Sequence, residues 1–137
     1  MSGTTLAEAI DRFEVDVDAH LDRTFEIPVL AGPQRQGDVM VVPTSKRRAT
    51  TPVPAAGHPV VRGEAGGNTH LLLAAGAVCF DARSVSATDL VLGVLSVDTD
   101  AEAYLAHPEH GYLGIAPGDY EVRRQREQAD EVRLVAD

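Results

Sequence analysis

The sequence predicts a mainly β fold: a small β-barrel or β-sandwich of about eight short strands, preceded by one N-terminal amphipathic helix. Short apolar runs alternate with turn signals about every 8 to 12 residues, which is typical of small β-domains. Only the first segment shows a helical period instead. With 137 residues and 44% hydrophobic residues, the chain can bury one core. We therefore divide it into a helix within residues 1–27 and a β-domain, residues 34–137.

Apolar residues recur at spacings of three and four along the first segment. They are Leu6, Ile10, Phe13, Val17 and Leu21. In an α-helix this spacing forms one stripe, with the acidic residues on the opposite face. Thr4 or Thr5 can cap the helix, and Pro28 ends it. The stripe either packs on the β-domain or docks on a partner protein.

The rest of the chain reads as strands because β-branched and other apolar residues come in short runs between Gly-rich or Pro-rich turns. The expected strands are 38–43, 58–64, 70–75, 77–82, 90–98, 102–106, 112–115, 120–127 and 131–136. A barrel and a sandwich give the same alternation of apolar and polar residues, so both architectures stay open.

Composition excludes several classes of function. The 21 acidic and 12 basic residues give a net charge of −9, which argues against a nucleic-acid partner. The longest strongly apolar run, residues 71–80, is about half of a membrane span, so we expect no membrane association. The single Cys79 and an acidic rather than basic N-terminus indicate a cytoplasmic protein. The preference for Arg over Lys and the Ala/Val-rich composition suggest a bacterial or phage origin.

The histidines form the best candidate constellation. His107 and His110 flank a Pro-Glu pair, and a turn there would let both imidazoles face one ion. The candidate metal ligands are His70, His107, His110 and Glu64, with Glu109 as an alternative acid. Nitrogen and carboxylate ligands suit Zn, Fe or Mn. The alternative is that these histidines are caps and hydrogen-bond partners.

Four segments also carry a resemblance. They are 36–43 (QGDVMVVP), 62–70 (RGEAGGNTH), 107–110 (HPEH) and 117–127 (PGDYEVRRQRE). In this order they resemble a family of small bacterial and phage proteins of uncharacterised function. Its members show QGDVLL, GEVTGHxH, HEEH and PGxYxVxRQREY segments. The resemblance covers the chain from about Gln36 to Asp137, and it implies histidine positions rather than a reaction. Asn68 replaces the first histidine of the HxH pair, so His70, His107 and His110 carry over.

A weaker resemblance is to cupins, small β-barrels that hold a metal with three histidines and a glutamate. The glycine-led segment ending at His70 and the later Pro117–Gly118 turn are similar. Asn68 interrupts the histidine pair, and no histidine follows Gly118. The resemblance therefore implies a barrel shape without cupin metal chemistry.

Two hypotheses for function follow. In the first, the protein is a non-catalytic interaction or assembly module whose acidic helix docks on a protein partner or on a second copy of the chain. In the second, it is a histidine-based metal-binding β-domain, an accessory metalloenzyme. We favour the first, because Asn68 removes a ligand from the second.

Overall fold

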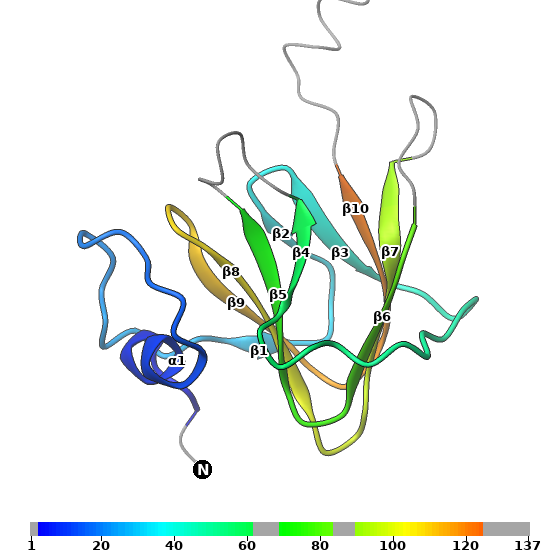
Figure 1. The fold of residues 1–137 in the computed structure, drawn as a ribbon, viewed down its shortest axis with the longest axis horizontal. Helices are drawn as coiled ribbons and strands as arrows, with labels where there is room; N and C mark the ends of the chain where they lie inside the picture. Colours follow the sequence, from blue (N-terminus) through cyan, green and yellow to red (C-terminus); the bar gives the residue numbers. More distant parts are fainter. Residues whose placement is uncertain (1–2, 62–68, 84–89, 125–137) are drawn as a thin grey trace, which may run out of the picture.

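The computed structural model describes residues 3–61, 69–83 and 90–124, and it shows a sandwich of two five-stranded sheets (Figure 1). The elements are α1 (Leu6–Phe13), β1 (Val29–Leu30), β2 (Gln34–Gln36), β3 (Val39–Pro43), β4 (His58–Val61), β5 (His70–Ala75), β6 (Val78–Ala82), β7 (Val91–Val97), β8 (Glu102–His107), β9 (Gly111–Ile115) and β10 (Gly118–Arg124). The first sheet has the order β1-β9-β8-β5-β4, and the second has the order β2-β3-β10-β7-β6. The mainly β prediction is confirmed, and the described strands form a sandwich rather than a closed barrel.

The helix begins where the sequence predicts and ends earlier. Thr5 caps α1 with its hydroxyl, which accepts from the Glu8 N–H at 3.2 Å, while the Glu8 carboxylate accepts from the Thr5 N–H at 2.9 Å. Glu14 then adopts a left-handed conformation with φ of 58° and closes the helix. The Asp16 carboxylate accepts from the next N–H at 2.8 Å, a local bond that competes with helix. The apolar residues up to Leu21 therefore lie on a short helix and on the folded loop that follows it.

Most of the expected strands are present, and two further strands, β1 and β2, were missed. β1 has only two residues, and it pairs in parallel with β9. β2 is the polar segment Gln-Arg-Gln, which lacks any apolar signal. Its side chains explain its position: the Gln34 amide donates to the Gly114 carbonyl at 2.7 Å, so β2 ties the second sheet to the first. The expected strand 131–136 lies outside the described residues.

Two cores stabilise the fold. The main core fills the space between the sheets and includes Val39, Leu72, Leu95, Ile115 and Tyr120. The second core lies between the N-terminal segment and the outer face of the first sheet, with Tyr104 and Leu73 at 1% exposure. The N-terminal segment is thus an integral layer on the first sheet (Figure 1).

No helix among the described residues is both long enough and apolar enough to cross a membrane.

Candidate functional site

One end of the sandwich gathers three histidines of the first sheet. His70 opens β5, His107 ends β8, and His110 lies in the turn between β8 and β9. The ring centroids are 4.4 Å apart for His70 and His107, 4.5 Å for His107 and His110, and 6.4 Å for His70 and His110. The turn between β2 and β3 and the last residues of β10 reach the same end (Figure 1). We call this end, with Gln36, Asp38, His70, His107, His110 and Arg124, the histidine end.

Gln36 fixes the protonation of His70. The Gln36 Nε2 donates to the carbonyls of Leu105 and Gly111 at 2.9 and 3.1 Å. Its Oε1, which can only accept, therefore faces the His70 Nδ1 at 3.0 Å. In the neutral ring the proton sits on Nδ1, and Nε2 presents a lone pair.

The lone pair of His70 faces a carboxylate. His70 Nε2 lies 3.6 Å from Asp38 Oδ1, and the His70 side chain is 5% exposed. Burial, followed by the neighbouring His107, lowers the pKa of His70 from 6.5 to about 4, although Asp38 acts in the opposite direction. His70 is therefore neutral near pH 7 and a weak base.

His107 acts as a cap for its own turn. Its Nδ1 accepts from the N–H groups of Glu109 and His110 at 3.1 and 3.3 Å. Because Nδ1 is the acceptor, the proton of the neutral ring is on Nε2. A ring in this state lacks the Nε2 lone pair that a metal ion requires. The H-x-x-H spacing therefore forms a capped turn here, with one imidazole directed at the backbone.

Gly37 allows the second sheet to approach the histidines. It adopts a φ of +60°, and a Cβ there would lie 3.2 Å from His110 Nε2 and 3.4 Å from His70 Cε1. Only glycine accepts this conformation and this contact without strain. Gln36, Gly37 and Asp38 thus act together as one tight turn against the imidazoles.

Sequence reasoning missed three residues of this end. Gln36, Asp38 and Arg124 appeared only as members of the motifs 36–43 and 117–127. In the structure, Arg124 Nε donates to Asp38 Oδ2 at 3.0 Å. All four segments that carry the family resemblance supply residues at this end or lead into it. That shared order of motifs is the signal that could have identified them.

The other sequence-predicted ligands do not complete a metal site. Glu64 lies outside the described residues, and Glu109 is exposed. Within the described parts of the chain, no group of three or more His, Cys, Asp or Glu side chains is arranged to hold a metal ion. The end as described is a hydrogen-bonded network of imidazoles, one amide and one ion pair.

The predicted partner-binding stripe is turned inward. Leu6 and Val17 are buried, and Ile10, Phe13 and Leu21 pack against the same second core. Tyr112 closes this layer, because its hydroxyl donates to the Val15 carbonyl at 2.7 Å. The five side chains hold the segment on the first sheet and leave its acidic side toward solvent.

Two hollows flank this layer, one toward each end of β8. The smaller, about 170 Å³, adjoins the histidine end. Its lining is Leu6, Leu21, Asp22, Phe25, Ile27, His110, Gly111 and Tyr112, and we call it the apolar pocket. Phe25 is 53% exposed and is one of two large hydrophobic side chains exposed in the described part of the chain; the other is Leu30, at 49%.

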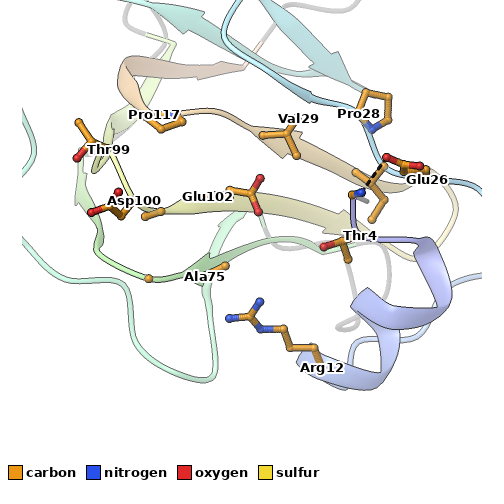
Figure 2. A pocket seen from close by; sticks show the side chains of 14 residues that line it. Thr4, Arg12, Glu26, Pro28, Val29, Ala75, Thr99, Asp100, Glu102 and Pro117 are labelled. Atoms are coloured by element: carbon orange, nitrogen blue, oxygen red, sulfur yellow. Dashed lines mark hydrogen bonds between the residues drawn. The ribbon is translucent and has the colours of Figure 1, made fainter. Parts of the chain in front are cut away.

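The larger hollow, about 980 Å³, is an open groove between α1 and the first residues of β8 (Figure 2). Arg12 lies on one wall, and Glu26, Asp100 and Glu102 line other parts of it. The described residues that line it include no histidine or cysteine.

Comparison with known proteins finds a family match for most of the β-domain. A family model described as a domain of unknown function, DUF8820, matches residues 35–125. No curated protein and no solved structure gives a significant match. The matched range contains every residue of the histidine end and excludes α1. Since it spans more than half of the sequence, the chain belongs to the DUF8820 family, an uncharacterised family as the sequence predicts.

Proposed function

We propose that the protein is a non-catalytic interaction module that docks on a protein partner through its N-terminal segment. The observation that carries the proposal is the folded state of that segment. It packs on the first sheet through a core of its own and keeps Phe25, 53% exposed, on the surface. A preorganised surface of this kind loses little conformational freedom on binding, which favours affinity.

The position of the segment supports the proposal. It precedes the region matched by the family, which starts at residue 35. Arg23 stabilises the described loop after α1. Its guanidinium donates to the carbonyls of Val17, Asp18 and Leu21 at 3.0, 2.8 and 3.1 Å. Such bonds fix a loop that would otherwise be mobile. The segment therefore supplies a defined surface outside the matched β-domain.

The state of the histidines supports a binding role over a catalytic one. A general base works best with a pKa near the working pH, whereas the pKa of His70 is lowered to about 4. The Nδ1 of His107 is already used by two backbone N–H groups. These two imidazoles thus serve the structure of the turn and of β5.

Selection from a random peptide library displayed on phage tests this proposal. Selected peptides are added to the full chain, and hydrogen exchange is followed residue by residue. We expect the peptides to protect backbone amides between residues 6 and 27 and to leave unchanged the far wall of the groove of Figure 2, at Ala75 and residues 99–102. Protection confined to the histidine end, or no enrichment of peptides over a blank surface, would contradict the proposal.

A second candidate, the binding of a divalent metal ion at the histidine end, is favoured by one observation. The neutral His70 Nε2 and the Asp38 Oδ1 are two acceptors only 3.6 Å apart. Two ligands of one tetrahedral zinc ion are about 3.4 Å apart. Gln36 orients His70 in the manner of the hydrogen-bonded groups that surround metal ligands. The exposed His110 is the third ligand in this hypothesis, after a turn of its ring, and His107 is excluded by its cap.

Zinc titration by calorimetry tests the second candidate. If it is right, Asp38→Asn and His70→Asn abolish stoichiometric uptake, while His107→Asn retains it. Uptake that disappears with His107→Asn alone would refute this ligand set. Absence of uptake by the unaltered chain would refute metal binding.

A further inference from the structure

The apolar pocket is the part of the N-terminal surface with the most specific shape. It is partly enclosed, holds about 170 Å³, and is lined mainly by aliphatic and aromatic side chains. An apolar cavity of about 150 Å³ holds one benzene molecule. The pocket therefore has room for one leucine or phenylalanine side chain.

The charge around the pocket is negative. Asp22 lines it, and Asp18 is fixed beside the turn between β8 and β9 through its N–H, which donates to the Pro108 carbonyl at 2.7 Å. Glu109 is exposed on that same turn. Arg23, the nearby cation, is engaged by Asp16 at 3.3 Å and by main-chain carbonyls. A ligand that is complementary to this rim carries positive charge.

Phe25 adds a feature suited to such a ligand. It lines the pocket and is 53% exposed, so part of its ring remains available at the mouth. An arginine or lysine side chain beside the anchor can lie over an aromatic face and gain a cation–π contact. A buried apolar anchor with a charged rim is the usual pattern of an interface hot spot.

We propose that the apolar pocket binds a basic peptide segment of a partner protein through one leucine or phenylalanine anchor. This inference rests on the proposed function and specifies its partner. The apolar side chain occupies the space between Leu21, Phe25 and Tyr112. The flanking lysines or arginines face Asp18, Asp22 and Glu109.

Fluorescence anisotropy with defined peptides tests the inference. The probe is a labelled nine-residue peptide of alternating lysine and serine with one central phenylalanine, and its match has serine at the centre. We expect the phenylalanine peptide to bind the full chain at least about tenfold more tightly, as burial of one large apolar side chain predicts. Phe25→Ser and Asp22→Lys should each weaken binding by about tenfold. Leu30→Ser, which removes the second large hydrophobic side chain exposed among the described residues and lies outside the pocket, should leave binding unchanged.

Several outcomes would overturn the inference. Equal binding of both peptides would mean that charge alone attracts them. Equal losses of peptide affinity in Phe25→Ser and Leu30→Ser would mean that the peptide does not bind specifically at the pocket. Concentration-dependent self-association of the chain that Phe25→Ser abolishes would make a second copy the occupant. If neither peptide binds while library peptides protect residues 6–27, the inference fails and the proposed function stands. Circular dichroism confirms that each variant is folded.

Discussion

Replacing His70 with asparagine should remove a specific part of the pH dependence of stability. The amide nitrogen of asparagine takes nearly the position of Nδ1, so it can still donate to Gln36 Oε1, but it does not titrate near neutral pH. The substitution therefore preserves the bond that orients this position. It removes only the group whose pKa burial and His107 lower to about 4.

The size of the effect follows from linkage. Above pH 6.5 His70 is neutral in both the folded and the unfolded chain, so its protonation does not reduce the free energy of unfolding there. As the pH falls from 6.5 toward 4, the unfolded chain binds a proton at His70 and the folded chain does not. The free energy of unfolding therefore decreases across this window, by on the order of 3 kcal/mol for a pKa lowered from 6.5 to about 4.

Urea unfolding between pH 8 and pH 4 measures this effect, with EDTA present so that protons alone compete for Nε2. The free energy of unfolding of the unaltered chain should decrease by on the order of 3 kcal/mol more than that of His70→Asn over this range. His20→Asn is the matched control, because the His20 side chain is 69% exposed, and it should follow the unaltered chain. Parallel curves for the unaltered chain and His70→Asn would refute the reasoning.

Three further substitutions test the arrangement through the free energy of unfolding. Gln36→Leu leaves two main-chain carbonyls and one imidazole N–H without their partner, and we expect a loss of about 2 to 3 kcal/mol in urea melts; a loss under about 0.5 kcal/mol would contradict the network. Gly37→Ala should cost about 1 to 2 kcal/mol because of its φ of +60° and the contact with an imidazole, whereas Gly32→Ala, with no atom within 4 Å of its Cβ, should be nearly neutral. Tyr112→Phe should cost about 1 kcal/mol, because the Val15 carbonyl loses the hydroxyl that donates to it at 2.7 Å, and a loss under about 0.3 kcal/mol would contradict the role of that bond.

The sequence predicted those elements whose signal is apolar periodicity. β5, from His70 to Ala75, was predicted with its observed ends because an apolar run lies between two turns. β2 was missed because its signal is polar. Gln36 is buried and Gln34 is half-buried, and their amides donate to carbonyls that lie about 70 to 80 residues later in the chain. No local pattern reports such partners.

For the N-terminal segment the sequence predicted too much regular structure, because the expected helix is longer than α1. The stripe up to Leu21 is real, because Val17 and Leu21 pack in the same core as Leu6. Spacing alone does not distinguish a continuous helix from a helix and loop that bury the same residues. The deciding signal was the alternation of Val and Asp after Phe13, which is unfavourable in a helix.

At the histidine end, the sequence predicted that the three histidines lie close together, but it did not predict which of their ring nitrogens carry protons. His70, His107 and His110 do lie together, but the roles of the His70 ring and of His107 Nδ1 are set by partners distant in sequence or by the backbone. The tautomer of His70 depends on Gln36, and that of His107 depends on two N–H groups of its own turn. The chemistry of an imidazole cluster therefore depends on hydrogen bonds that residue identity does not encode.

His110 connects the two proposed surfaces. It lines the apolar pocket of the N-terminal segment, and its ring lies 4.5 Å from that of His107 in the histidine end. The next residue, Gly111, lines the same pocket and accepts a hydrogen bond from Gln36 at 3.1 Å. A peptide anchored in the pocket therefore contacts the turn that positions the histidines. Since binding energies at two coupled sites are reciprocal, any ligand that moves His110 at one site must change affinity at the other. The N-terminal segment, which precedes the matched residues 35–125, is thus packed against the turn that carries His107 and His110.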